Sequence, residues 1–210
     1  MFCKETIELL NNIIMLILKQ DDKKTKQECL HYLTHPGAVL LLPTETVYGL
    51  VCNWDDKEAV RKIRQMKGRD AEKPLQMLSG SLVSLEEVGV EITNEIRKVY
   101  DTFCPGPITI IAKASRPKTI GFRIPDHGLM QDLLLAFGSN FAATSANLAG
   151  FPPAVTVDEA LSTLNGSPDL IVDAGPIKGK ASTVVDMTGP YFHILREGPI
   201  TEKQIAKVLI

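Results

Sequence analysis

The stretch Val39 to Leu50, which reads VLLLPTETVYGL, decides the fold class. Its opening residues form a short apolar run between Gly37 and Pro43, and such a run is typical of a buried strand. Two threonines, a glutamate and a tyrosine then follow before Gly49. Because ligands gather at strand ends in α/β sheets, these polar side chains indicate a binding site beside a buried strand.

Strand and helix signals alternate along the rest of the chain, which predicts an α/β protein with a mixed sheet. Capping residues mark the expected helix starts at Asp55 or Asp56, at Thr156 and at Thr201. Expected strands lie at 39–42, 75–78, 108–112, 120–124, 141–143, 170–172, 183–186 and 192–195. Expected helices lie at 5–19, in the segment ending at 35, and at 55–67, 92–103, 156–164 and 201 onward.

Composition is that of an ordinary globular protein, with 210 residues, 44% of them hydrophobic and 23% charged. A net charge of -2 argues against nucleic-acid binding over the whole surface, although it allows a local basic groove. The four cysteines show no paired metal spacing, and the apolar run at 13–18 is too short to span a membrane. No targeting segment is recognisable, so we expect a cytoplasmic protein with reduced thiols and no membrane contact.

Polar or charged side chains occur in four segments where elements are expected to end, the opening stretch among them. Arginine, lysine and hydroxyl groups around glycine are suited to a polyphosphate, which presents many acceptor oxygens. No P-loop or Rossmann glycine pattern is present. The segments concerned are Thr44–Tyr48, Lys67–Asp70, Thr144–Asn147 and Gly179–Asp186, with Arg123 and Arg196 inside strand-like segments.

Each of these features also has a purely structural interpretation. Lysine and arginine at a helix end complement the helix dipole, and serine and asparagine are common turn formers. An internal carboxylate such as Asp173 or Asp186 would account for Arg123 and Arg196. His31 and His35 have a metal-ligand spacing but no evident third ligand, so no metal site is expected.

Seven motifs follow one another along the chain: LPTETVYGL (42–50), KGRDAEKPL (67–75), CPGPITII (104–111), FRIPDH (122–127), TSANLAG (144–150), STVVD (182–186) and LREGPIT (195–201). In this order they resemble the motifs of the YrdC/Sua family of threonylcarbamoyl-AMP synthases. The resemblance runs from about residue 34 to the C-terminus. It implies a twisted mixed sheet flanked by helices, with a basic concave cleft, in a catalytic domain at 34–210 preceded by a helical extension at 1–33.

The resemblance implies an L-threonylcarbamoyladenylate synthase, a nucleotidyltransferase. Its substrates would be L-threonine, bicarbonate or CO2, and ATP with Mg²⁺, and its products threonylcarbamoyl-AMP and pyrophosphate. The adenylate would pass to the proteins that transfer its threonylcarbamoyl group to tRNA.

The resemblance also assigns site residues. Those implied to bind threonine are Thr44, Tyr48, Arg123, Ala143 and Ser182. Those implied to bind ATP are Lys67, Arg69, Thr119, Ser145, Asn147, Pro153 and Arg196. The K-x-R pair (Lys67, Arg69) and the S-x-N pair (Ser145, Asn147) are the catalytic candidates, and we expect Lys67→Ala or Arg69→Ala to abolish most adenylate formation without unfolding the protein.

One departure concerns Leu78, where some relatives have a threonine-binding histidine and this chain reads Gln76-Met77-Leu78. It bears on threonine affinity rather than on reaction type.

Two rival functions remain. A YrdC-like module could bind nucleotide or RNA without catalysis, and a related module could transfer a carbamoyl group to another acceptor. The second usually belongs to a much larger chain with zinc-binding cysteine pairs.

Overall fold

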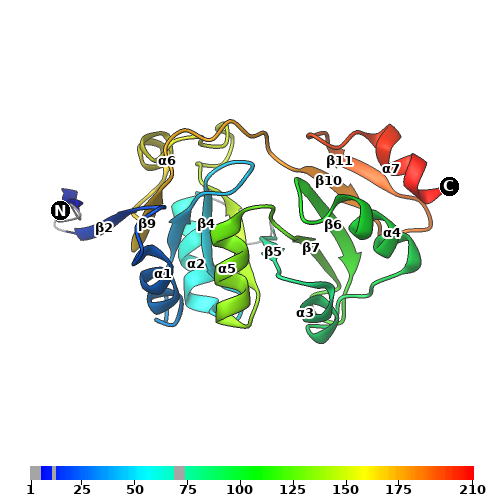
Figure 1. Cartoon of the computed structure of the whole chain (residues 1–210), viewed down its shortest axis with the longest axis horizontal. Coiled ribbons are helices and arrows are strands. Elements are labelled where there is room, and N and C mark those ends of the chain that lie inside the picture. The colour runs from blue at the N-terminus through cyan, green and yellow to red at the C-terminus, as the bar shows by residue number, and fades with distance from the viewer. Residues whose placement is uncertain (1–5, 11–12, 69–73) are drawn as a thin grey trace.

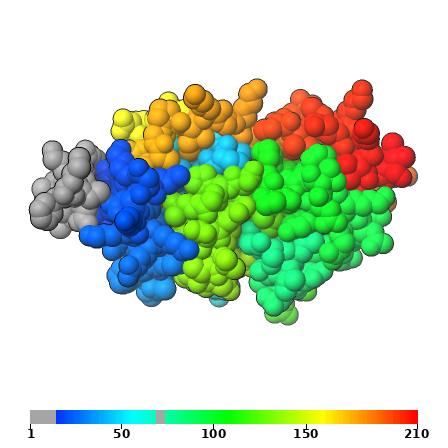
Figure 2. Space-filling view, in the orientation of Figure 1, coloured from blue at the N-terminus to red at the C-terminus, as the bar shows by residue number. Residues whose placement is uncertain are grey.

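The computed structural model describes residues 6–10, 13–68 and 74–210, and the side chains of 6–10 and 13–14 are outside this description. The molecule is elongated, with β2 (Ile13–Lys19) at one end and α7 (Glu202–Leu209) at the other (Figure 1). The connection between β9 (Leu170–Asp173) and β10 (Thr183–Asp186) runs along the upper edge from one half to the other (Figures 1 and 2). Among the described residues, no helix combines the length and apolar character needed to cross a membrane.

The described residues form one mixed sheet in the order β1-β2-β9-β3-β4-β8-β5-β7-β6-β10-β11. Parallel pairs join β2 to β9, β9 to β3, β5 to β7 and β6 to β10, and the other neighbours are antiparallel. The predicted mixed sheet is therefore confirmed. The strands are β1 (Thr6–Leu10), β2 (Ile13–Lys19), β3 (Leu40–Leu42), β4 (Gly49–Asn53), β5 (Gln76–Leu78), β6 (Ile108–Lys113), β7 (Thr119–Arg123), β8 (Phe141–Ser145), β9 (Leu170–Asp173), β10 (Thr183–Asp186) and β11 (His193–Arg196).

The helices cover the sheet unevenly. Around β3, Val39 and Leu41 pack with α2 and α6, whereas Leu40 and Leu42 pack with α1 and α5. Both faces are apolar there, which explains the uninterrupted apolar run. The helices are α1 (Thr25–Leu33), α2 (Lys57–Met66), α3 (Leu82–Glu87), α4 (Asn94–Phe103), α5 (Gly128–Phe137), α6 (Val157–Thr163) and α7 (Glu202–Leu209).

The other half of the sheet has one face packed by α3, α4 and α7. Ile108, Ile110 and Ala112 of β6 point into this core, as do Ile120 and Phe122 of β7. Successive side chains on a strand point to opposite faces, so the intervening residues face the other way. Those intervening residues form the floor of a cavity.

Capping residues start the helices largely as predicted. Asp56 Oδ1 accepts hydrogen bonds from the backbone N–H groups of Glu58 and Ala59, both at 2.9 Å, at the start of α2. Thr201 and Gln204 form the reciprocal capping box of α7. Helices α3 and α5 and strand β4 were not predicted.

The helix predicted for residues 5–19 is wrong, because these residues contain β1 and β2. Met15 is buried in the cluster on one face of the sheet and Leu18 in the cluster on the other. A strand buried on both faces is continuously apolar, and periodicity alone does not separate such a run from a buried helix. The α1 helix agrees with the second predicted helix, while the division of the chain at residue 34 stays a prediction.

Candidate functional site

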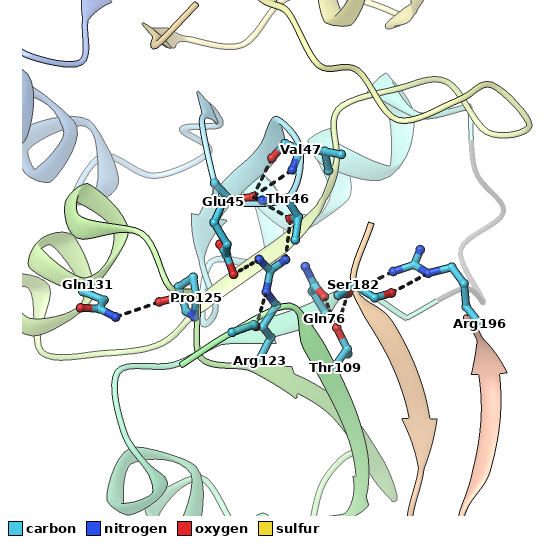
Figure 3. A network of polar contacts seen from close by, with 12 residues as sticks. Glu45, Thr46, Val47, Gln76, Thr109, Arg123, Pro125, Gln131, Ser182 and Arg196 are labelled. Atoms are coloured by element: carbon cyan, nitrogen blue, oxygen red, sulfur yellow. Dashed lines mark hydrogen bonds and ion pairs between the residues drawn. The ribbon is translucent and has the colours of Figure 1, made fainter. Parts of the chain in front are cut away.

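A cavity of about 280 Å³ opens on the uncovered floor of the sheet. Its wall includes residues of β5, β6, β7, β8, β10 and β11, together with Thr46 and Val47 from the loop between β3 and β4. Figure 3 shows the polar network at this place. Six residues that the resemblance assigns to substrate binding line the cavity: Thr119, Arg123, Ala143, Ser145, Ser182 and Arg196.

Arg123, at the end of β7, is buried with 3% of its surface exposed. Its Nε donates to the Gly106 carbonyl at 3.2 Å, and its Nη1 donates to Thr46 Oγ1 at 2.8 Å. Its Nη2 forms an ion pair with Glu45 Oε1 (Figure 3). An internal carboxylate therefore does accompany Arg123, but it is Glu45 rather than Asp173 or Asp186.

Arg196, at the end of β11, is bound to Ser182 at the opposite side of the cavity. Its Nε donates to the Ser182 carbonyl at 3.0 Å and its Nη2 to Ser182 Oγ at 3.1 Å. Partial burial and the nearby Arg123 guanidinium lower the pKa of Arg196. Two guanidinium groups on one cavity suit an anionic ligand, because each carries donors and positive charge.

Two further side chains, Thr109 and Gln76, continue this network across the floor. The Oγ atoms of Ser182 and Thr109 are 2.8 Å apart, and Thr109 donates to Gln76 Oε1 at 3.1 Å. The chain of contacts thus joins β11, the start of β10, β6 and β5 (Figure 3).

Thr44 does not line the cavity but organises the loop that does. Its hydroxyl donates to the Val47 carbonyl at 2.7 Å and accepts from the backbone N–H groups of Thr46 and Val47 at 3.1 and 3.2 Å. It also lies 2.8 Å from Thr46 Oγ1. These bonds position Thr46 beside Arg123, so Thr44 affects the cavity only indirectly, through the loop residues that it holds.

Tyr48 is fully buried in the core and is not part of the cavity wall. Its hydroxyl donates to the Gly175 carbonyl at 2.8 Å and accepts from the Ala174 N–H at 3.0 Å. Burial raises the pKa of the Tyr48 phenol, which keeps it protonated as a donor. It thereby fixes the start of the β9–β10 connection. Further on, Gly179 lies so close to the Glu45 and Thr46 backbone that a Cβ would clash.

Lys67, just after α2, is buried with 1% exposed and also lies outside the cavity wall. Its Nζ donates to the Ser145 carbonyl, to the Asn147 carbonyl at 2.7 Å and to Asn147 Oδ1 at 3.3 Å. The Asn147 amide nitrogen donates to the carbonyls of Leu148 and Phe151 at 2.9 and 2.7 Å. Lys67 and Asn147 therefore shape the loop that follows Ser145.

Two remaining candidates have different placements. Pro153 is half-buried in the loop after β8 and does not line the cavity. Arg69 lies outside the described residues. A larger hollow of about 510 Å³ beside α4 has Glu91, Glu95 and Lys113 in its wall. Its two carboxylates make that hollow less suited to an anionic substrate than the cavity that holds Arg123 and Arg196.

The sequence placed Glu45 and Thr46 in a candidate segment but gave them no individual role, and it did not assign Gln76, Thr109 or Gly121 to the site. The signal that could have found Thr109 and Gly121 is the alternation of side chains along β6 and β7. Thr109 and Ile111 line the cavity between the core residues Ile108, Ile110 and Ala112. A small or polar residue between apolar neighbours in a strand indicates the face that is not packed by helices.

The chain is similar in sequence to a family model and to curated proteins. The family model Sua5_yciO_yrdC, described as "Telomere recombination", matches residues 33–198. A Threonylcarbamoyl-AMP synthase of Bacillus subtilis is 34% identical over 188 residues, which are 84% of this chain and 54% of the relative. One of Pyrococcus abyssi is 33% identical over 183 residues, which are 82% of this chain and 54% of the relative. The chain thus spans about half the length of these two relatives.

The solved structure of P. abyssi Sua5 complexed with L-threonine superimposes with a TM-score of 0.85. It is 29% identical, and the match covers 93% of this chain and 61% of that chain. The family model accounts for most of the chain, including the segments that form the cavity. The chain therefore belongs to the Sua5/YciO/YrdC family.

Proposed function

We propose that this chain is an L-threonylcarbamoyladenylate synthase. It would make threonylcarbamoyl-AMP and pyrophosphate from L-threonine, bicarbonate or CO2, and ATP, for the threonylcarbamoyl-adenosine modification of tRNA. The names of the relatives and the threonine complex of P. abyssi Sua5 support this reaction. The nucleotidyltransferase class follows from the proposed transfer of AMP to the carbamate oxygen.

One observation carries the proposal: six residues implied to contact threonine or ATP converge on a single cavity that contains both Arg123 and Arg196. A volume of about 280 Å³ is just below the lower limit for small-molecule sites, which span roughly 300–1,000 Å³. We assign the amino acid to the Arg123 side, where the guanidinium would bind its carboxylate. We assign the nucleotide to the side that contains Ser145, Thr119 and Arg196.

The proposed chemistry depends mainly on positioning. The neutral amine of threonine attacks CO2, forms the new N–C bond and loses a proton to water, which gives a carbamate. A carbamate oxygen then attacks the α-phosphorus of ATP while the bond to the β-phosphate breaks and pyrophosphate leaves. Arg196 would stabilise the charge that builds on the phosphates, and no covalent enzyme intermediate is needed.

Lys67 and Asn147 take a supporting part in this proposal. They fix the loop that begins at Ser145, so that Ser145 faces the cavity at the end of β8. Arg69 remains the phosphate contact implied by the resemblance. Preorganised groups of this kind lower the reorganisation needed to reach the transition state.

Magnesium enters this proposal with the nucleotide. The described residues contain no group of three or more His, Cys, Asp or Glu side chains suited to hold a metal ion. The one carboxylate beside Arg123, Glu45, is engaged in the ion pair. Mg²⁺ commonly binds through substrate phosphates and few protein ligands, so the ATP phosphates would hold it here.

The test is pyrophosphate release from ATP with Mg²⁺ and bicarbonate, measured with L-threonine, with L-serine and without an amino acid. We expect release that depends on threonine, together with an adenylate product identified by mass spectrometry. Bound ATP or RNA without threonine-dependent release would instead favour the module that binds nucleotide or RNA without catalysis. Transfer of the adenylate to tRNA would be followed separately by adding the downstream transferase proteins.

A further inference from the structure

We propose that the side-chain amide of Gln76 binds a carboxylate oxygen of the amino-acid substrate, beside Arg123. This inference rests on the proposed function and adds a residue that the resemblance does not assign to the site. Gln76 is half-buried at the start of β5 and lines the cavity. Its role follows from the direction of the hydrogen bonds that connect it to Arg196.

An arginine side chain can only donate hydrogen bonds, and this fixes the direction of the whole series. Arg196 Nη2 donates to Ser182 Oγ. Gln76 Oε1 can only accept, so the Thr109 hydroxyl proton goes to Gln76. Thr109 has one proton and cannot also donate to Ser182, so Ser182 donates to Thr109 across their 2.8 Å contact. Every hydroxyl then has one donor and one acceptor role filled.

The consequence is a fixed orientation of the Gln76 amide group. With Oε1 held by Thr109, the Nε2 atom is directed away from Thr109, on the side of Arg123 (Figure 3). Within the described part of the chain, no group accepts a hydrogen bond from Nε2. Gln76 therefore presents the two N–H donors of Nε2 to the cavity, while its Oε1 faces Thr109.

Gly121 makes this reach possible. Strand β7 lies between β5 and β6, and Gly121 precedes the Phe122 that pairs with Met77. At Gly121, β7 has no side chain on the cavity face, and the Gln76 side chain reaches Thr109 two strands away. A Cβ on Gly121 would be in ordinary contact with Thr109, at 3.6 Å, and a longer side chain would occupy this space.

The donors of Gln76 select the chemistry of their partner. Beside a guanidinium, two further N–H donors fit a group that only accepts hydrogen bonds and carries negative charge. The threonine carboxylate meets both conditions and is assigned to the Arg123 side of the cavity. Because Glu45 already offsets part of the Arg123 charge, neutral donors nearby add binding without requiring a second buried charge.

The test compares Gln76→Met, which keeps the length but loses the donors, with Gln76→Glu, which replaces them by a charge that repels a carboxylate. We expect the Kd and KM for L-threonine to rise roughly ten- to hundredfold in Gln76→Met, the range for a hydrogen bond to a charged group, and further in Gln76→Glu. The KM for ATP should stay within about twofold. Gln27→Glu, on the exposed face of α1, is the matched control and should behave as the wild type.

A second pair of variants tests the fixed orientation. Thr109→Val keeps the shape but removes the hydroxyl that holds Gln76, and should weaken threonine binding roughly three- to tenfold. Thr109→Ser restores the hydroxyl and should recover most of the affinity. Threonine Kd values within twofold of the wild type in both Gln76 variants would overturn the inference, as would a rise confined to the KM for ATP.

Calorimetric titration of threonine without ATP separates this inference from the proposed function. If the wild type binds threonine but releases no pyrophosphate, the synthase proposal fails and the Kd values of the Gln76 variants still decide the role of Gln76. If the wild type does not bind threonine, both proposals are wrong. Thermal unfolding of each variant checks that it is folded at the assay temperature.

Discussion

Substitution of Lys67 by methionine should destabilise the fold as well as lower activity. Lys67 is 1% exposed, and its ammonium group donates to two backbone carbonyls and one side-chain amide oxygen in the loop after β8. Methionine has a similar length but no donor. The Ser145 and Asn147 carbonyl oxygens would lose their charged hydrogen-bond donor, and methionine offers no hydrogen bond in its place.

The expected magnitude follows from these contacts. A hydrogen bond to a charged group contributes roughly 1.5–3 kcal/mol, and an unpaired buried acceptor costs about 1–3 kcal/mol. Since the contacts share one ammonium group and are not additive, we expect a total loss of about 3–4 kcal/mol. For a domain of this size, 1 kcal/mol corresponds to roughly 2–4 °C, so the Tm should fall by roughly 10 °C.

The measurement is thermal unfolding followed by circular dichroism, with Lys62→Met as the matched control. Lys62 lies on α2 and pairs with Asp169, but both side chains are 34% exposed, so its loss should cost at most about 1 kcal/mol. A Tm within about 2 °C of the wild type for Lys67→Met would refute the anchoring role. Loss of pyrophosphate release with unchanged stability would then favour the direct phosphate contact implied by the resemblance.

Three other substitutions or treatments have defined outcomes. Glu45→Gln leaves the buried Arg123 without its countercharge and should lower the free energy of unfolding by about 3 kcal/mol, as a reduced urea midpoint. Burial lowers the pKa of His127 from its usual 6.5, so His127 binds a proton more readily in the unfolded chain than in the folded protein. Stability should therefore fall as the pH drops below about 6.5, and His127→Gln should reduce this dependence; equal pH profiles for the two proteins in urea unfolding would contradict it. Burial raises the pKa values of Cys29 and Cys52 to about 12, so iodoacetamide at pH 8 should label them only after denaturation, as peptide mass spectrometry would show.

Local signals in the sequence were sufficient for much of the fold. Strands such as 40–42 and 108–113 are short apolar runs bounded by glycine or proline, and Asp56 caps α2 as its residue type suggests. The prediction for residues 13–19 failed because a strand buried on both faces has no polar–apolar alternation to distinguish it from a helix. The strand order was not readable, since it depends on contacts between distant segments.

The site was predictable as a region but less so residue by residue. Of the polar residues in the segment 44–48, Thr46 lines the cavity, whereas Tyr48 points into the core and the Thr44 hydroxyl is bonded within its own loop. Lys67 likewise donates hydrogen bonds to the backbone of a neighbouring loop and does not line the cavity. A motif indicates that these side chains are needed. It does not show whether a side chain contacts the ligand or supports the loop that contacts it.

The uneven covering of the sheet has a consequence for how this architecture can diversify. On β6 and β7, alternate residues pack in the hydrophobic core, while their neighbours, such as Thr109 and Gly121, lie on the face that lines the cavity. Substitutions at the second set change what the cavity accepts without removing apolar contacts from the first. Stability and ligand choice thus depend on alternating positions of the same strands, and one set can be changed without the other. Strands β6 and β7 are therefore a suitable place to select for altered substrates in a library of variants.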